Sequence, residues 1–532
     1  MPTLDWIGKK AVLNHHQQVP FHLLKCDKGL SVGDPDVGNL LVQGDNLVAL
    51  KALLPYYANK VKCIYIDPPY NTGNEKWIYN DAVNSAEMKN WLGTVVGAEA
   101  EDLSRHDKWL CMMYPRLALL RQFLRIDGVL LVSIGDDEIA SLIYILDEIF
   151  GPRNRVAIFS WKSRAKPVNV GEAKVKPQQV AEYVCVYSRI ADNGKFFPIP
   201  SGEARVYPEK LGNRPYRLQT ILKSNRGESV RETMRFEIAG YKPPSDERWQ
   251  GGKRFIQDLY DSGYIEFRDG TPFRRYFEDE EPDENDPLYA FLPPEWTGTA
   301  ETGKAELNQI LGNRHGFDTV KPTLLIKRLL AASTKDNDII LDSFAGSATT
   351  GHAILGLNKQ DGGSRRFILV EMDENICQSV TTQRLRNIIE GYSTEKGGKK
   401  EQIPGLGGGF RFCRLAEPLF DESGNIRKSV SFSDLAAHVY FSETGSPLPA
   451  RVKSGSPMLG VYDGKAVYLL YNGILGDKKP DGGNVLTGEI LQSLPPHNGP
   501  KVIYGEACRL GETRLRSEQI SFKQIPYEIK VN

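Results

Sequence analysis

The stretch VKCIYIDPPYNTG, residues 61–73, decides the fold of this chain. Its first six residues form a short β-rich run, and the two prolines and the Asn and Gly that follow predict a buried strand ending in a stiff loop. Pro68 and Pro69 fix their own φ angles and push their predecessors away from the α region, so Asp67 and Tyr70 are held in one geometry. Ligands of an open α/β sheet bind at the carboxyl ends of its strands. A carboxylate beside a flat ring at that end can bind a planar base that carries an amino group.

Strands alternate with helices over much of the remaining chain. We expect seven strands, at 39–43, 61–66, 129–134, 156–161, 182–187, 338–341 and 366–370. Residues 4–18 predict a short helix, followed by an irregular stretch to residue 38, and residues 105–126 predict a long apolar helix that Pro115 kinks or breaks. This alternation is typical of a doubly wound, mostly parallel, Rossmann-like α/β sheet.

A second group of chemistry-bearing residues follows the sixth expected strand, in the loop DSFAGSATTG, residues 342–351. A strand, a loop of small residues and a helix can direct backbone N–H groups at the anionic end of a ligand, although the same residues also suit a tight turn chosen for packing. Glu371 directly follows the next strand, where an acidic side chain can accept the two hydroxyls of a ribose. Asp45 follows strand 39–43. It is expected to act either as the N-cap of the next helix or as a residue of the pocket. No GxxxxGK[ST] sequence occurs, which excludes an ATP-binding P-loop.

The tetrapeptide Asp67-Pro68-Pro69-Tyr70 resembles the catalytic motif of amino-group DNA methyltransferases. The longer run DPPYNTGNEKWIYND, residues 67–81, resembles their adenine-N6 branch. The catalytic motif comes first and the cofactor loop last, which resembles the circularly permuted β class. In the sheet of that family the strands before the two motifs are neighbours at the topological switch point. We therefore expect the two loops to share one crevice.

The resemblance implies which residues act in each half of the reaction. It implies a catalytic role for Asp67, Pro68, Pro69 and Tyr70. It implies that S-adenosylmethionine is bound by Asp45, Asp67, Lys321, Pro322, Asp342, Phe344, Gly346, Ser347 and Glu371. Lys321 and Pro322 belong to the motif FDTVKPTL near the methionine end of the cofactor, Glu371 holds its ribose and Asp45 its adenine. No metal site is implied.

The family loop reads Asp-Pro-Phe-x-Gly-Ser-Gly-Thr-Thr, and this chain departs from it twice. Ser343 replaces the Pro, and Ala348 replaces the second Gly. The Cβ of Ala348 is expected to narrow the pocket, which leaves open a DNA-binding module with a decayed cofactor site. Cytosine-N4 methylation is a second alternative, although its loop more often begins with Ser, and RNA methylation is a third. Cytosine-C5 chemistry needs a nucleophilic Cys, usually in a Pro-Cys pair, which the chain lacks.

The charge balance of the chain implies that any affinity for DNA comes from local basic patches. Lys and Arg together number 67, as do Asp and Glu, so the net charge is zero. Residues 153–176 hold seven basic residues against one acidic one, and residues 201–260 interleave basic with aromatic residues. Both patterns suit phosphate contact and base stacking, although a solvated surface is the simpler account of any single residue. The acidic run 278–286 predicts a surface loop.

The seven cysteines are scattered without a CxxC pair, which predicts reduced thiols in a cytoplasmic protein and neither disulfides nor zinc. No apolar run approaches the length of a membrane span, and the N-terminus lacks the profile of a signal peptide.

The expected organisation has five parts: an N-terminal extension (1–38), a catalytic half (39–190), a target-recognition insert (191–315), a cofactor half (316–400) and a C-terminal α+β domain (405–532). The C-terminal domain has β-like runs at 430–442, 458–471, 500–505 and 520–531. This domain and the stretches from Asp67 to Phe159 resemble the modification (Mod) subunits of type III or similar restriction–modification systems. The resemblance implies site-specific adenine-N6 methylation of double-stranded DNA, with a homodimer and a restriction (Res) subunit as the partners to consider.

Overall fold

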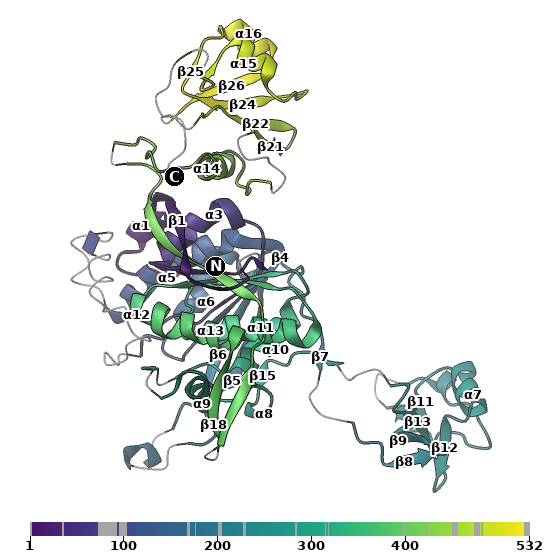
Figure 1. Ribbon diagram of the computed structural model, residues 1–532. Coiled ribbons are helices and arrows are strands. Elements are labelled where there is room, and N and C mark those ends of the chain that lie inside the picture. Colours follow the sequence, from purple (N-terminus) through teal and green to yellow (C-terminus); the bar gives the residue numbers. More distant parts are fainter. Residues whose placement is uncertain are drawn as a thin grey trace. The chain divides into compact units, whose positions relative to one another are not determined.

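The computed structural model describes residues 3–34, 37–72, 93–94, 104–167, 171–175, 177–200, 205–226, 230–281, 285–313, 315–317, 319–396, 399–421, 423–449, 456–472, 479 and 482–525 (Figure 1). The chain forms two compact units, one of Met1–Phe197 with Leu288–Asn532 and the other of Pro198–Pro287.

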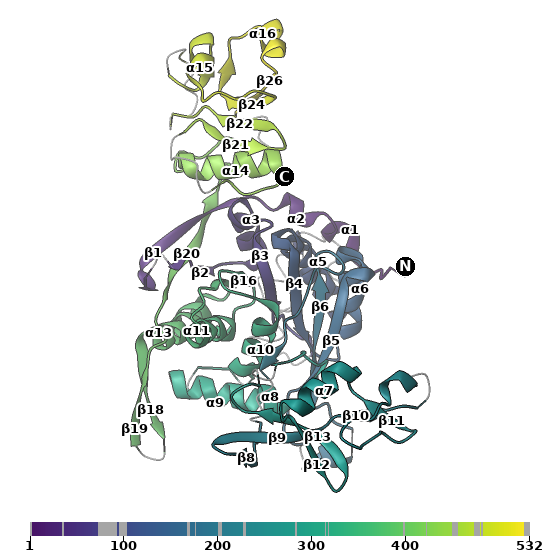
Figure 2. The ribbon, with the colours of Figure 1, turned by 90° about the vertical axis from the view of Figure 1, so that its right-hand side faces the viewer.

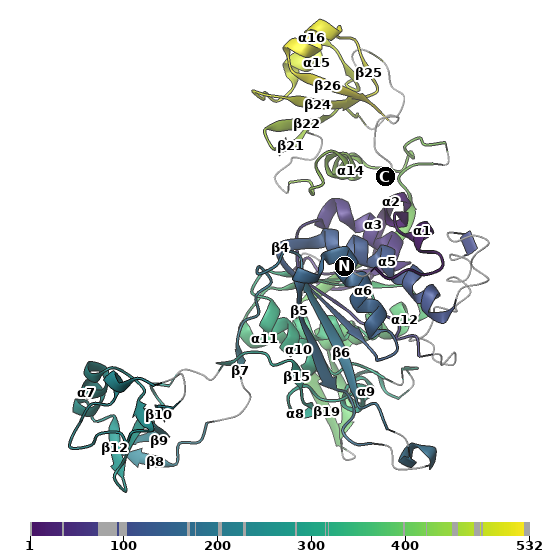
Figure 3. The same cartoon turned by 180° about the vertical axis from the view of Figure 1, so that it is seen from behind.

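The larger unit is built on a ten-stranded sheet with the order β1-β20-β2-β17-β16-β3-β4-β6-β5-β15. In that order the strands are β1 (His22–Gly33), β20 (Gly409–Pro418), β2 (Leu40–Gln43), β17 (Arg366–Glu371), β16 (Ile339–Asp342), β3 (Val61–Ile66), β4 (Leu124–Ile134), β6 (Ala181–Ser188), β5 (Arg155–Lys162) and β15 (Phe291–Leu292). The strands from β20 to β4 are parallel, whereas β1 and β6 are antiparallel to their neighbours. Figure 3 shows the pair β5 and β6 from behind.

All seven predicted strands lie in this sheet, but the predicted count of seven is wrong because β1, β20 and β15 extend it at both edges. β1 falls in the stretch expected to be irregular, and only Val32 of its residues is buried. An edge strand has one solvated side and few apolar residues, so its pattern gives a weak signal. β20 begins at the Gly-rich stretch where the C-terminal domain was expected to start, and it belongs to the main sheet.

Helices cover both faces of the sheet (Figure 2). One face packs against α3 (Asn46–Tyr57), α5 (Arg105–Phe123) and α6 (Ile139–Phe150). The other packs against α10 (Thr323–Ser333), α11 (Thr349–Asp361) and α13 (Thr382–Glu390). Successive side chains of β3 alternate between these layers, with Ile64 in the first and Cys63 in the second. The whole of β3 is buried, including Lys62, whose ammonium donates to the Asp127 carbonyl, and the doubly wound α/β arrangement is confirmed.

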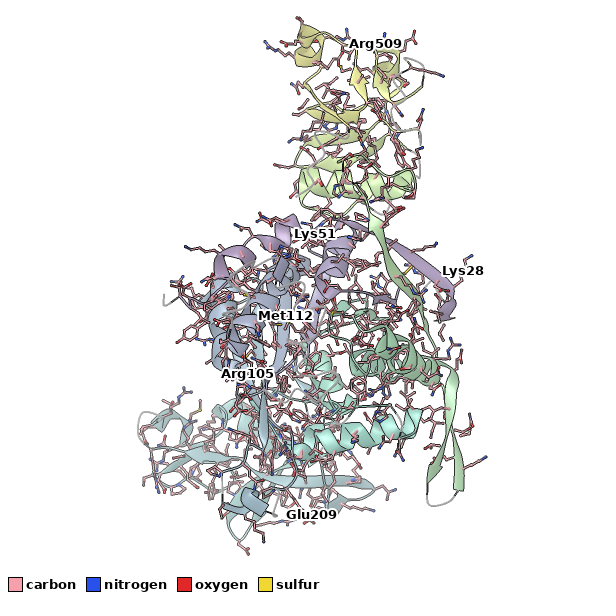
Figure 4. All side chains as sticks on the ribbon, turned by 90° about the vertical axis from the view of Figure 1, so that its left-hand side faces the viewer. Lys28, Lys51, Arg105, Met112, Glu209 and Arg509 are labelled. Atoms are coloured by element: carbon pink, nitrogen blue, oxygen red, sulfur yellow. A yellow bond between two sulfur atoms is a disulfide. The ribbon has the colours of Figure 1, made fainter. Side chains whose placement is uncertain are left out.

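Helix α5 runs without interruption through Pro115, and it carries Arg105 as its first residue and Met112 two turns later, both labelled in Figure 4. Its N-terminus has a capping box in which Ser104 and Asp107 satisfy each other's backbone N–H groups. The single helix predicted for residues 4–18 is two short ones, α1 (Lys9–Val12) and α2 (His15–Gln18).

Cys26 and Cys413 form a disulfide, so the expectation of seven reduced thiols is wrong for this pair. The two residues are directly opposite each other in the antiparallel pair β1–β20. They lie 387 positions apart in the sequence, which is why Cys spacing could not reveal the pairing.

The unit Pro198–Pro287 has a four-stranded sheet of order β12-β13-β9-β8. Its elements include β8 (Glu209–Leu211), β9 (Arg214–Thr220), β10 (Leu222–Ser224), β11 (Glu247–Trp249), α7 (Lys253–Asp261), β12 (Ile265–Arg268) and β13 (Thr271–Phe277). Trp249, Ile256 and Ile265 form part of its core. Three residues of the acidic run pair with its arginines: Asp279 with Arg214 at 2.8 Å, Glu280 also with Arg214, and Glu281 with Arg217 at 2.6 Å.

The C-terminal part has its own four-stranded sheet of order β21-β22-β24-β26. These strands are β21 (Met458–Tyr462), β22 (Lys465–Leu469), β24 (Lys501–Gly505) and β26 (Ile520–Gln524). The β-like run predicted for 430–442 is wrong, because Ser431 caps helix α14 (Phe432–Thr444) there. None of the described helices is both long and apolar enough to cross a membrane.

Candidate active site

The pocket of interest lies at the carboxyl ends of β3 and β16, which are neighbouring parallel strands. Its lining includes Tyr65, Asp67, Phe317, Thr319, Val320, Lys321, Asp342, Phe344, Ala345, Gly346, Ser347, Thr349 and Thr350. The loop after β3 and the loop after β16 therefore share one crevice, as the order of the motifs predicted.

Asp67 is held by an ion pair that the sequence did not indicate. The Lys321 ammonium donates to Asp67 Oδ1 at 3.0 Å and to Oδ2 at 2.9 Å. Burial raises the pKa of the Asp67 carboxyl, and the Lys321 charge opposes that shift without cancelling it. For Lys321, burial lowers the pKa, but the two carboxylates nearby outweigh it and the net shift is upward. The ammonium is therefore charged at neutral pH.

Tyr70 has a fixed orientation at the pocket. Its hydroxyl donates to Glu182 Oε2 at 2.8 Å, and the Lys321 ammonium lies 4.8 Å from the centre of its ring. Burial, followed by the charges of Asp67 and Glu182, raises the pKa of Tyr70 well above its usual value, so the phenol stays protonated. Gly135 packs against this ring, and a Cβ there would lie only 3.1 Å from Tyr70 Cδ2.

The rest of the Asp67 loop is fixed from α5. Trp109 Nε1 donates to the Pro69 carbonyl at 2.7 Å, and the side chain is fully buried. Asn71 adopts a left-handed φ of 58°, and its buried amide donates to the Arg105 carbonyl and to Glu138. These contacts give the loop the stiffness that its two prolines predicted. Residues 73–81 of the quoted family run lie outside the described residues.

Glu182 is a site residue that sequence reasoning missed. It accepts from Tyr70 and lies 3.2 Å from the Lys321 ammonium. Because β6 is antiparallel to β4, the start of β6 lies at the same edge as the ends of the parallel strands. The residues around a glutamate at the start of a strand do not indicate that it belongs to an active site.

The loop after β16 is organised around Asp342. Oδ1 of this buried carboxyl accepts from the Phe344 N–H at 2.9 Å, and Oδ2 accepts from Thr350 Oγ1 at 2.6 Å. Burial raises the pKa of Asp342 to about 7 despite these hydrogen bonds. Gly346 adopts a φ of 49°, and its N–H donates to Glu371 Oε2 at 2.8 Å.

Ala348 does not narrow the pocket, so that expectation is wrong. It adopts a left-handed φ of 62° at the N-cap of α11, and its fully buried side chain belongs to the core beneath the loop. It is absent from the pocket lining given above.

Three of the predicted cofactor residues are not among those lining the pocket: Asp45, Pro322 and Glu371. Asp45 is the N-cap of α3, accepts from the Val48 N–H at 3.0 Å and pairs with Arg116 at 3.1 Å. Pro322 is the N-cap of α10. Glu371 ends β17 beside β2, so Glu371 and Asp45 follow neighbouring strand ends.

Two further residues missed from the sequence support the Gly346–Ser347 backbone. Thr381 Oγ1 donates to the Gly346 carbonyl at 2.6 Å, and the fully buried Arg384 donates to the Ser347 carbonyl at 3.1 Å. A π-helical turn, Cys377–Thr381, immediately precedes α13, and such turns are frequent at functional sites.

Comparison with known proteins places this site in a family. A family model described as DNA methylase (N6_N4_Mtase) matches residues 61–382. The EcoPI Mod subunit of a type III restriction-modification enzyme, from Escherichia phage P1, is 30% identical over an alignment of 441 residues that covers 73% of this chain and 66% of the relative. The StyLTI Mod subunit of Salmonella typhimurium is 30% identical over 453 residues, covering 78% of this chain and 65% of the relative. This chain thus spans just under two thirds of the length of these Mod subunits.

The type II methyltransferase M.KpnI of Klebsiella pneumoniae is 29% identical over 375 residues, covering 66% of this chain and 84% of the relative. Among solved structures, the cytosine-N4-specific PvuII DNA methyltransferase matches 65% of this chain and 86% of its own, with 13% identity and a TM-score of 0.33. The family model spans more than half of the chain, from β3 to the start of α13, and includes both loops of the pocket. The chain therefore belongs to the N6/N4 DNA methylase family.

Proposed function

We propose that this chain transfers a methyl group from S-adenosylmethionine to adenine N6 at specific sites in duplex DNA, as the modification part of a restriction–modification system. The observation that carries the proposal is the meeting of the Asp67 loop and the Asp342 loop in one pocket. The names of the relatives, type III Mod subunits and type II methyltransferases, support the same activity.

The residues of the pocket fit the cofactor. The carboxyl of Asp342, with a pKa near 7, can bind a cationic group, and Phe344 and Phe317 offer apolar surface to the rest of the ligand. Glu371 and Asp45 follow the next two strands, where carboxylates can accept ribose hydroxyls and an adenine amine. When bound, S-adenosylmethionine supplies a methyl group that a nitrogen lone pair displaces from sulfur, which leaves as a neutral thioether.

The chain's own residues prepare the target amine. An exocyclic amine is a poor nucleophile because its lone pair is delocalised into the ring. The two N–H groups of the amine donate hydrogen bonds to the Asp67 carboxylate and the Pro68 carbonyl. These bonds draw the nitrogen lone pair out of conjugation with the ring. After the N–C bond has formed, the nitrogen releases one proton, which the Asp67 carboxylate can accept. Most of the rate acceleration comes from holding the target amine in line with the methyl group that it attacks.

Tyr70 supplies the surface for a base that has left the duplex. An adenine cannot reach Asp67 while it is stacked in DNA, so the nucleotide must flip outward. The Tyr70 ring, fixed by Glu182 and packed on Gly135, offers a rigid face on which the flipped base stacks.

The DNA itself is contacted elsewhere on the chain. We assign target recognition to the insert 191–315, which contains the compact unit Pro198–Pro287, and phosphate contact to the basic segment 153–176. A restriction subunit is the proposed protein partner, because the Mod relatives are named as subunits of restriction-modification enzymes. We also propose a homodimer, which light scattering of the purified chain would test.

Mass spectrometry of nucleosides tests the activity directly. Duplex DNA incubated with the purified chain and labelled S-adenosylmethionine should yield N6-methyladenine and remain uncut. N4-methylcytosine as the sole product would assign the chain to the cytosine branch, and label confined to RNA would contradict a DNA substrate. DNA binding without any methyl transfer would favour the decayed-site alternative.

A further inference from the structure

The Lys321 ammonium is shared between two carboxylates and two aromatic rings. It lies 2.9 Å from Asp67 Oδ2 and 3.2 Å from Glu182 Oε2. It also lies 4.8 Å from the centre of the Tyr70 ring and 5.7 Å from that of Trp161. The exposed fraction of the Lys321 side chain is 13%, so solvent screens these charges only weakly.

This arrangement conflicts with the proposed role of Asp67, which is to accept a hydrogen bond from the target amine. Lys321 donates to both oxygens of the carboxylate, at 3.0 and 2.9 Å. A carboxylate that neutralises an ammonium is a weaker acceptor for the N–H group of an adenine. The ammonium must therefore release at least one Asp67 oxygen when the target base arrives. A buried ammonium that loses its partner is strongly destabilised, so it needs another carboxylate within reach.

We propose that Glu182 is a positioning residue that takes over the Lys321 ammonium when the target amine binds Asp67, an inference that rests on the proposed function. Glu182 Oε2 already lies within salt-bridge distance of Lys321, so a small torsional change of the lysine completes the transfer. The same oxygen accepts from the Tyr70 hydroxyl, which keeps the stacking ring in place. Base capture and the release of Asp67 are thereby linked through one carboxylate.

Glu182→Gln separates the two roles of this side chain. The amide oxygen keeps the shape and can still accept from Tyr70, but it lacks the charge that attracts Lys321. We expect single-turnover methyl transfer to fall by roughly 10- to 100-fold, which corresponds to the loss of one charge-assisted contact. The cofactor affinity and the melting temperature should stay near those of the wild type.

The pH profile distinguishes this role from a structural one. In the Glu182→Gln variant, Asp67 is the one carboxylate among the described residues that still pairs with Lys321, and Lys321 releases it most easily after losing its own proton. The rate of this variant should therefore rise steeply toward alkaline pH, whereas the wild-type rate should not follow that rise.

A double-variant cycle gives the decisive comparison. In a Lys321→Met background no ammonium needs a second partner, and two unpaired carboxylates repel each other. Glu182→Gln should then be neutral or beneficial, although it is harmful in the wild type. Equal losses in both backgrounds, or a Glu182→Gln rate and pH profile like those of the wild type, would overturn the inference. Failure of the wild type to methylate DNA in the same assay would instead overturn the proposed function, and this inference with it.

Discussion

At the scale of single residues, Tyr70 is more constrained than a stacking surface needs to be. Its hydroxyl is bonded to Glu182, so the phenol fixes the ring while the ring contacts the base. Tyr70→Ala should reduce base capture by roughly ten- to a hundred-fold or more, because stacking contributes about 1–3 kcal/mol per base. Tyr70→Phe should lose only a few-fold, the effect of one neutral hydrogen bond. Single-turnover methyl transfer compares the two variants, and a Phe variant as slow as the Ala variant would rule out stacking as the main role.

Replacement of Asp67 should impair turnover much more than it impairs cofactor binding. Its carboxylate is used most fully as the target amine becomes pyramidal, so Asp67→Ala should abolish turnover while cofactor binding largely survives. Lys321 retains Glu182 as a partner in this variant, which limits the damage to the pocket. Cofactor titration beside single-turnover kinetics is the measurement. A parallel loss of cofactor affinity would show that Asp67 acts mainly in binding the cofactor.

The raised pKa of the buried Asp342 carboxyl should make the cofactor affinity depend on pH. Burial raises its pKa to about 7, so the folded protein holds a proton there over a range where the unfolded chain does not. The extra proton in the folded state means that stability falls as pH rises from about 4 to about 7. A cationic ligand favours the ionised form, so its affinity should rise over the same range, by up to roughly tenfold per pH unit. Asp342→Asn should flatten this dependence in a calorimetric titration, and an unchanged slope would contradict it.

At the scale of elements, the turn between β16 and α11 tolerates a residue that the family pattern lacks. Ala348 takes a left-handed conformation that costs an L-residue roughly 1–2 kcal/mol. Its methyl group is buried in the core, which offsets part of that cost. The turn thus keeps its shape through its place in the fold rather than through a glycine.

Ala348→Gly should therefore leave the cofactor affinity within about threefold of the wild type. Relief of the backbone strain is opposed by the lost methyl group and by the greater freedom of the unfolded chain, so stability should change by no more than about 1 kcal/mol. Cofactor titration and chemical unfolding measure the two effects. A tenfold gain in affinity would mean that the alanine does restrict the pocket.

At the scale of the whole molecule, a chain of zero net charge must bind DNA through local patches. Lys162 ends β5 at the carboxyl edge of the sheet, and Lys166 and Lys174 follow it as exposed residues. Lys176, the last residue of the predicted cluster, lies outside the described residues. Lys162, the first of the other three lysines, directly follows Trp161, whose ring centre lies 5.7 Å from the Lys321 ammonium at the pocket.

Replacing one of these three lysines by Gln should lower the salt slope of DNA binding by about one unit and leave the site preference unchanged, because a phosphate contact carries no sequence information. Lys28 on β1, labelled in Figure 4, is the matched control and should leave the slope unchanged. Binding measured over a series of salt concentrations gives the slopes. An unchanged slope in all three variants would place the cluster away from the DNA.

The amino-acid sequence by itself determined the central strands and the two loops of the site. β3 is apolar apart from Lys62, and β16 is apolar up to Asp342, because both of their faces are buried, and the Pro- and Gly-rich loops that follow mark where they end. These signals are local, so they survive in the sequence whatever lies nearby in space. The DPPY tetrapeptide and the Asp342 loop were found for that reason.

Only the tertiary structure decided which contacts between distant residues complete the site. Glu182 reaches Tyr70 because an antiparallel strand reverses which of its ends faces the pocket, and Lys321 meets Asp67 across 254 positions of sequence. Cys26 and Cys413 pair through the register of the edge strand β1 with its neighbour β20, and Ala348 directs its methyl group into the core. Each of these contacts depends on strand order, register or side-chain direction, and no local pattern of residues encodes those properties.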